Sequence, residues 1–335
     1  MDTTKTLFEL IQRYGTVREL SDFLQSRGHG GGNSWAQLID DRIKPALEKG
    51  KLSLETLLTF LRDAEEYGRQ HVFLFRRTAA GNSVPSDSNV RGWLNSVGSL
   101  SVMDEPRILD LPETREIAEV RRDPASHSEI LVIKVIERCT HDTLLRVTEP
   151  DDSGRYSKEY VREETRAVNV VRVHQNGMLE FRLTQHRGAS RNYDAELRDL
   201  KAIVSGLIDP ATLHPINLVK AKNKLYEKRH ELNGTVSFSS THIRDSDGVS
   251  HTAACGGQVS LFSFSRTEQS IATLTADGEA YPDSLNVWWL KQEQKPPHQK
   301  IHVLLSGADN EFAITQQCSR GDYEHVLGEI LRFNT

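Results

Sequence analysis

The longest strongly apolar stretch of the chain is Ile130-Leu131-Val132-Ile133-Lys134-Val135-Ile136. Its length is far too short to span a bilayer, and this composition is typical of a buried β-strand that Lys134 interrupts. Further along, Asn176-Gly177 is a strong hairpin turn between two β-rich segments. We therefore predict antiparallel strands at residues 130–137, 143–148, 166–174 and 178–184.

The faces of that hairpin depend on the length of its turn. With a two-residue turn, Arg172 and His174 would share a face with three apolar residues, namely Leu179, Phe181 and Leu183. Neither face would then be cleanly polar. We therefore expect both sides of the hairpin to be partly covered.

The chain before this sheet predicts helices. Thr16-Val17-Arg18-Glu19 has the pattern of a capping box, in which the Thr16 hydroxyl accepts from the Glu19 amide and Glu19 reaches back. An apolar stripe at helical spacing follows, and Gly28 suits a helix C-terminus. Ser53 can cap another amphipathic helix. We expect Val17, Leu20, Leu24, Leu38 and Ile39 to pack together, with residues 28–33 as an exposed loop.

The remaining segments complete an α+β fold: a small helical N-terminal domain followed by a β-rich body with an antiparallel sheet and interspersed helices. Residues 78–106 are rich in Gly, Ser, Asn and Pro, which favours a linker. Helices are expected near 193–207, 215–232 and 322–333, and a second β region at 236–315. The predicted domains are 1–77 (helical), 78–106 (linker), 107–232 (β-rich, ending in two helices) and 233–335 (antiparallel β with a C-terminal helix).

Composition indicates an ordinary globular protein. The 335 residues are 37% hydrophobic and 27% charged, and the formal net charge is −5. The N-terminus lacks the basic and apolar segments of a signal peptide, so we predict a cytoplasmic protein that does not insert into membranes. Cys139, Cys255 and Cys318 lie far apart, a spacing typical of separate thiols rather than of a disulfide framework or a zinc site.

Residues 16–43 resemble the SAP motif, a short helix–loop–helix module known for DNA binding. The matching residues are Val17-Arg18-Glu19-Leu20, Leu24, Arg27-Gly28, Ala36, Leu38-Ile39 and Ile43. His29, Asn33, Trp35 and Asp40-Asp41 depart from the pattern; the two aspartates stand where an arginine is frequent. The resemblance implies a DNA contact by the head, and the lost positive charges weaken that implication because phosphate neutralisation supplies most non-specific affinity.

The order of elements is similar to that of the centromere protein N family. A helical head, a helix near 53–67 and an apolar segment at 71–75 precede a β-rich body. That family binds chromatin through its N-terminal half. The resemblance therefore also implies a nucleic-acid partner.

A basic central region carries the predicted contact with nucleic acid. Residues 155–230 contain fifteen Lys and Arg residues against nine Asp and Glu residues, in a chain that is acidic overall. Within it, Lys220, Lys224 and Lys228 are spaced to form one exposed helical stripe opposite Leu218, Ala221 and Leu225. The polar loop 185–193 adds Arg187 and Arg191, with Tyr193 able to stack on a base. An ordinary solvated helix face is the alternative.

One pattern suggests an enzyme. Pro282-Asp283 followed by Glu293-Gln294-Lys295 matches the PD-(D/E)xK signature of metal-dependent nucleases formally, but the prolines after Lys295 favour a loop over the strand that this chemistry needs. No Walker A sequence or GxSxG elbow occurs. His242, His251 and Cys255 have no spacing that requires a metal ion. We expect no cofactor, no metal and no catalysis.

The sequence thus predicts a non-catalytic nucleic-acid-binding protein, with DNA favoured over RNA, that uses Arg187, Arg191, Lys220, Lys224 and Lys228. One alternative is a protein–protein adaptor whose helical head docks a protein partner. A second is a nuclease using Asp283, Glu293 and Lys295. Sequence preference, oligomeric state and pathway do not follow from the sequence.

Overall fold

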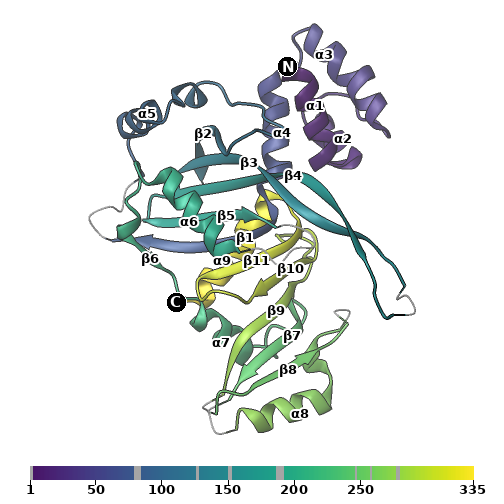
Figure 1. Ribbon diagram of the computed structural model, residues 1–335, viewed down its shortest axis with the longest axis vertical. Helices are drawn as coiled ribbons and strands as arrows, with labels where there is room; N and C mark the ends of the chain where they lie inside the picture. Colours follow the sequence, from purple (N-terminus) through teal and green to yellow (C-terminus); the bar gives the residue numbers. More distant parts are fainter. Residues whose placement is uncertain are drawn as a thin grey trace. The chain divides into compact units, whose positions relative to one another are not determined.

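The computed structural model describes residues 3–78, 84–125, 128–149, 153–185, 192–245, 247–256, 259–276 and 280–335. It is an α+β protein with N-terminal helices and a β-rich body (Figure 1). The chain forms two compact units, each made of two segments. Unit 1 comprises Met1–Arg13 and Arg77–Thr212, and unit 2 comprises Tyr14–Arg76 and Leu213–Thr335. The contiguous domains that we predicted group the chain differently.

Unit 1 contains an antiparallel sheet in the order β2-β3-β4-β5. Its strands are β2 (Glu116–Ala125), β3 (Ser128–Val147), β4 (Lys158–His174) and β5 (Met178–Thr184). Its helical segments are α1 (Thr3–Tyr14, whose last residue belongs to unit 2), α5 (Asp87–Ser96), η3 (Leu100–Met103), α6 (Tyr193–Val204) and η4 (Pro210–Thr212).

One face of the unit 1 sheet is apolar and is covered by α6. Asn192 caps this helix by accepting from the Ala195 amide at 3.1 Å. Leu197 and Leu200 are buried, and the Lys201 ammonium lies 5.9 Å from the ring centre of Phe181 on β5. Figure 1 shows α6 beside the strands of this sheet. The helix predicted at 193–207 therefore exists and closes the core of this unit.

The turn between β4 and β5 has three residues, not the two that we assumed. Arg172 pairs with Glu180, and Val173 pairs with Leu179. Gly177 has φ +79°, a left-handed conformation, and its amide donates to the His174 carbonyl at 3.1 Å. The extra residue shifts the register by one and reverses the faces. The expected face of mixed polarity is wrong: Arg172 and His174 lie on the side opposite Leu179.

The segment predicted to be a linker contains a packed helix. Ser86 caps α5 by accepting from the Asn89 amide at 3.4 Å. Val90, Trp93 and Leu94 of α5 are buried. The helical spacing of Val90, Trp93 and Leu94 was overlooked in the sequence because Gly, Ser and Asn residues, which are typical of loops, surround them.

Unit 2 contains a second antiparallel arrangement, in the order β1-β11-β10-β9-β7-β8, with β6 beside β1. The strands are β1 (Gly68–Arg77), β6 (Leu213–Pro215), β7 (Val236–Arg244), β8 (Ser250–Ala254), β9 (Tyr281–Trp289), β10 (Ile301–Leu305) and β11 (Glu311–Gln317). The helical segments are α2 (Val17–Gln25), η1 (Gln37–Ile43), α3 (Lys44–Glu48), α4 (Leu54–Glu66), α7 (Val219–Glu227), η5 (Leu261–Ser263), α8 (Ser265–Leu274) and α9 (Arg320–Phe333).

The C-terminal helix α9 supplies much of the core of unit 2. Tyr323 is fully buried, and its ring centre lies 5.6 Å from that of Tyr67 and 6.5 Å from that of Phe312 on β11. α7 packs against both α9 and β9. The strand β1 pairs with β11, so residues from the two ends of the chain complete one sheet.

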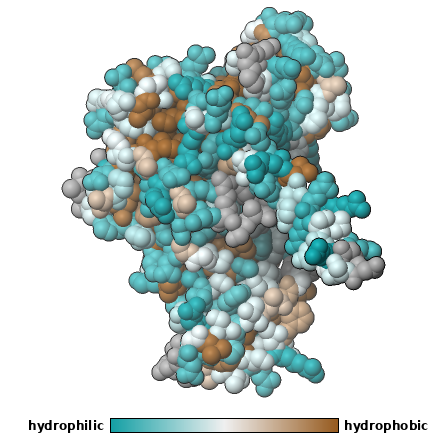
Figure 2. Space-filling view, in the orientation of Figure 1, coloured by the Kyte–Doolittle hydropathy of each residue, from teal (hydrophilic) through white to brown (hydrophobic). Residues whose placement is uncertain are grey.

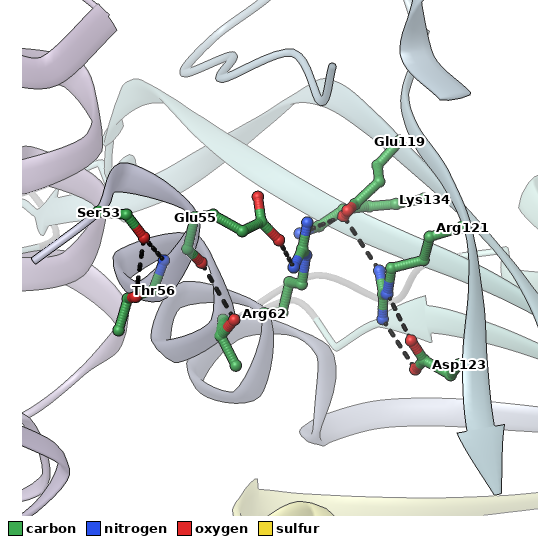
Figure 3. Close-up of polar contacts among 9 residues, drawn as sticks. Ser53, Glu55, Thr56, Arg62, Glu119, Arg121, Asp123 and Lys134 are labelled. Carbon is green, nitrogen blue, oxygen red and sulfur yellow. Dashed lines mark hydrogen bonds and ion pairs between the residues drawn. The ribbon is translucent and has the colours of Figure 1, made fainter. Parts of the chain in front are cut away.

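The predicted capping box at the start of α2 is confirmed. The Thr16 hydroxyl accepts from the Glu19 amide at 3.2 Å, and the Thr16 amide donates to the Glu19 carboxylate at 2.9 Å. The loop at 28–33 separates α2 from η1, a π-helix in which Leu38 and Ile39 are buried. In α4, Ser53 caps the first turn and Arg62 pairs with Glu55 (Figure 3).

Among the helices of the described residues, none combines the length and the apolar character that crossing a lipid bilayer requires.

Candidate functional site

The predicted lysine stripe lies on α7, which is shorter than expected. Leu218, Ala221 and Leu225 are buried as predicted. On the opposite side, Lys220 and Lys228 are exposed and Lys224 is half-buried. The spacing of the apolar residues therefore predicted correctly which side of this helix faces solvent.

Two of the three lysines already have partners. The Lys224 ammonium donates to the carbonyl of Thr335 at 2.5 Å, and that of Lys228 lies 3.6 Å from the Glu231 carboxylate. Lys220 makes no ion pair with any described residue. The stripe thus offers one uncommitted ammonium group, which is little for a polyanion. Arg187 and Arg191 lie outside the described residues.

A fourth lysine of this helix points inward. Lys222 is buried and donates from its ammonium to the Asp283 carbonyl at 2.7 Å. Burial lowers the pKa of Lys222, with Asp309 and Asp283 opposing that change. This lysine therefore anchors α7 to β9 rather than serving a ligand.

The residues of the nuclease pattern are not brought together. Asp283 lies near the start of β9, whereas Glu293 and Lys295 follow the end of that strand. Six strand residues separate Asp283 from the strand's end, which corresponds to about 20 Å at about 3.3 Å per residue. The Asp283 carboxylate instead lies 3.3 Å from the Arg244 guanidinium. Within the described residues, no group of three or more His, Cys, Asp and Glu side chains could hold a metal ion.

Sequence reasoning predicted only one strand, at residues 143–148, of an exposed ribbon of unit 1. Beyond their pairing with β2 and β5, the strands β3 and β4 continue as a two-stranded ribbon that stands out from the sheet (Figure 1). We call this ribbon, residues 139–149 and 153–165, the arm. Its strands are paired from Cys139 with Thr165 out to Val147 with Lys158, with a bulge between Leu144 and Arg146.

The arm concentrates exposed apolar surface. Of the thirteen large apolar side chains that are exposed in the described part of the chain, six belong to it: Leu144, Leu145, Val147, Tyr156, Tyr160 and Val161. Leu145, at the bulge, is 63% exposed and Tyr160 is 53% exposed. Monomeric proteins rarely gather such side chains on one surface element unless it contacts something.

The pairing register makes the arm amphipathic. Leu144 lies opposite Tyr160, and Val147 lies on the same face beside Lys158. The other face carries mainly polar pairs; His141 and Thr143 both reach the Glu163 carboxylate, at 3.2 and 3.0 Å. The side of the arm visible in Figure 2 is largely hydrophilic, which fits a ribbon with one polar face.

The charge of the arm distinguishes it from a nucleic-acid-binding ribbon. Residues 139–165 contain four Lys and Arg residues and seven Asp and Glu residues. A ribbon that enters a DNA groove needs an excess of cations to neutralise phosphates. This surface therefore suits a protein better than a polyanion.

The opposite face of the unit 1 sheet carries buried charges. Arg121 pairs with Glu119 at 3.0 Å and with Asp123 at 2.9 Å, and Lys134 lies 3.9 Å from Glu119 (Figure 3). Glu119, Asp123 and Lys134 are buried, and Arg121 is half-buried. The burial of these charged side chains shows that this face of the sheet is covered, as expected from the apolar run around Lys134.

Glu180 continues this charged face on β5. Its carboxylate accepts from Arg182 at 2.7 Å and from Arg172 at 3.3 Å, and lies 2.5 Å from a His174 ring nitrogen. Burial raises the pKa of Glu180, but Arg182, Arg172 and His174 outweigh burial and hold the pKa well below the ordinary value for glutamate. This arrangement is a structural ion cluster in which every charge faces an opposite one.

The protein-family models contain no match to this chain, and neither do the curated proteins. We therefore argue function from the geometry described above.

Proposed function

We propose that this chain is a non-catalytic protein-binding adaptor, and that the apolar face of the arm is its contact surface. The observation that carries the proposal is the gathering of exposed large apolar side chains on the arm, with Leu144, Val147 and Tyr160 on one face. Protein interfaces bury an apolar centre rich in aromatic residues within a polar rim. On the arm, Arg162 paired with Asp142 at 3.1 Å supplies such a rim.

The face of the arm suits a partner better than its edges do. A bulge at Leu144 and Arg146 interrupts one strand, and five of the eight residues 158–165 on the other are charged. Both features are typical of edges that are protected against pairing with another strand. The partner is therefore expected to pack against side chains, not to add a strand.

A pair of arm variants tests the proposal. The face variant Leu144→Ser, Val147→Ser, Tyr160→Ser removes the apolar centre, and the control variant Thr143→Ser, Val161→Ser alters the other face of the same strands. Each protein is cross-linked in cell extract with and without nuclease treatment, and the captured proteins are identified by mass spectrometry. We expect the amount of one defined partner captured by the face variant to be at least tenfold lower than that captured by the parent. The control variant should capture as much of this partner as the parent does.

Sedimentation velocity of the same proteins shows whether that partner is a second copy of the chain. Equal capture by both variants, together with equal sedimentation, would contradict the proposal. Capture that disappears on nuclease treatment would instead favour nucleic acid.

Nucleic-acid binding remains the competing prediction, and exposed Lys220 is the observation in its favour. A salt titration of duplex DNA binding compares the parent with Lys220→Glu, Lys224→Glu, Lys228→Glu. If the three lysines touch phosphates, the slope of log affinity against log salt falls by about three units. The adaptor proposal expects the same weak binding and the same slope in both proteins.

A further inference from the structure

Unit 2 contains a cleft that is separate from the arm. It lies between the hairpin β7–β8 and the helix α8 and has a volume of about 580 Å³. Ligand sites in proteins usually measure about 300–1,000 Å³. The space is therefore large enough for a small organic molecule.

The walls of the cleft are of two kinds. Ile243, Ile271 and Leu274 form an apolar wall, and the rest of the lining consists of Ala253, the polar residues Thr241, Ser250, His251, Thr252, Thr267 and Ser270, and Arg266. Ile271 is only 3% exposed, so the apolar wall belongs to the packed core of this region. A ligand that fills the cleft must present hydrocarbon on one side and polar groups on the other.

Arg266 sets the charge of the cleft. Its side chain is exposed, and its guanidinium makes no hydrogen bond or ion pair with the described residues. Asp245 lies near the cleft but is already engaged, 2.8 Å from a ring nitrogen of His251. Among the described lining residues there is no Asp or Glu. A guanidinium group without a carboxylate beside it favours an anionic group.

We propose that this cleft binds a small amphiphile with an apolar body and one anionic head group, such as a carboxylate, sulfonate or phosphate. The body packs against Ile243, Ile271 and Leu274, and the head pairs with Arg266. The two features disfavour other ligand classes: a cation would meet the positive charge of Arg266, and a ligand with hydroxyl groups on every side would place some of them against the apolar wall. This site goes beyond the adaptor role of the arm and does not depend on it.

Two probes of matched shape test the proposal with the full chain. Both 8-anilinonaphthalene-1-sulfonate and N-phenyl-1-naphthylamine fluoresce in apolar sites, and only the first carries a sulfonate. We expect saturable binding of the sulfonate probe with one site per chain. Arg266→Gln should weaken the sulfonate probe about tenfold and leave the neutral probe unchanged, whereas Arg266→Lys retains part of the affinity. Arg198→Gln, an exposed arginine on α6, is the control.

A second variant tests the location of the site. Ala253 lines the cleft and is only half-buried, so Ala253→Phe fills the space with little disturbance of the core. It should abolish binding of both probes. If Ala253→Phe has a lower melting temperature than the parent, Ser270→Trp is used in its place. Ser270 also lines the cleft and is exposed on α8, so tryptophan there fills the same space.

Three results would overturn the proposal. The first is binding of the sulfonate probe that persists in both Ala253→Phe and Ser270→Trp. The second is an affinity of Arg266→Gln for the sulfonate probe that equals that of the parent. The third is fluorescence that disappears in Leu144→Ser, Val147→Ser, Tyr160→Ser, because the probe would then be reporting the arm. The last result leaves the adaptor proposal standing, so failure of the cleft and failure of the arm are distinguishable.

Discussion

Glu180 has no exposed side-chain surface and lies between the guanidinium groups of Arg182 and Arg172. Glu180→Gln removes the charge that both groups face. Breaking a buried ion pair by removing one partner usually costs about 3–5 kcal/mol. We expect a loss of that size at pH 7, measured as the shift in urea unfolding followed by circular dichroism. Glu159→Gln, on the exposed arm, should change stability by less than about 0.5 kcal/mol.

The same residue gives a pH dependence whose sign is fixed. Since the pKa of Glu180 is lowered in the folded protein, its contribution is fully present above the pKa of about 4.3 in the unfolded chain. The contribution is lost as the pH falls below that value towards the folded pKa. The stability difference between the parent and Glu180→Gln should therefore narrow steadily as the pH falls below about 4. If the stability difference between the two proteins stayed constant as the pH fell, the ion pairs assigned to Glu180 would be contradicted.

Single-residue roles were predictable where a local pattern determines them. The capping of α2 by Thr16 and the inward positions of Leu218, Ala221 and Leu225 follow from spacing along one helix. The partner of Lys224 did not follow, because the carbonyl of Thr335 comes from the far end of the chain. Exposure can be inferred from helical periodicity, but the neighbours of a side chain depend on the tertiary fold.

Two glycines of unit 1 should respond oppositely to the same change. Gly177 has φ +79° in the turn between β4 and β5, and alanine in that conformation costs about 1–2 kcal/mol. Gly92 lies inside α5 with open space where a Cβ would stand, so alanine there should stabilise by up to about 1 kcal/mol. Thermal melting of Gly177→Ala and Gly92→Ala checks both signs. Equal shifts would contradict the assigned turn.

The arm should be dispensable for folding. Replacing residues 141–163 with Asn-Gly joins Thr140 to Glu164, which are paired across the two strands. Because nearly all of the described side chains that are removed are exposed, we expect the melting temperature to change by only a few degrees. The partner captured through Tyr160 should be lost. A collapse of stability would show that the arm belongs to the core of unit 1.

The strands were predicted in part, and the misses have a physical cause. The segments 130–137 and 143–148 were expected as separate strands but belong to the single strand β3. Residues 158–165 were not predicted as a strand, since both faces of the arm meet solvent and the usual alternation of apolar and polar residues is absent. The feature of the sequence that indicates an exposed β-strand here is the presence of three residues with high β-propensity, Tyr156, Tyr160 and Val161, among charged residues.

At the scale of the whole molecule, the fold class was predictable and the grouping of segments was not. α+β character follows from composition and periodicity along the chain. The pairing of β1 with β11 joins residues such as His71 and Glu311, which stand 240 positions apart. Local sequence patterns do not indicate which strands pair over such a separation. For this reason the domains predicted from the sequence are each one continuous segment.

This pairing predicts the effect of truncation. Removing residues 1–77 as a supposed helical domain also removes β1, and leaves the edge of β11 without its neighbour. We expect such a protein to aggregate, as measured by light scattering. Removing the head only as far as Lys51, ahead of α4, keeps β1 and should preserve more soluble protein. Equal solubility of the two truncations would contradict the role of β1.

The split composition of unit 2 also has a consequence on the ribosome. β1 is synthesised early, but its partner β11 emerges only after roughly 240 further residues, which takes about 12–50 seconds at about 5–20 residues per second. During that interval the segment 77–212 can fold as a completed insertion, while the apolar residues Val72, Phe73 and Leu74 wait for their partner. In a nascent chain of this protein, the edge of β1 that pairs with β11 therefore lacks its partner through most of translation, and this edge is where a ribosome-associated chaperone would be expected to bind.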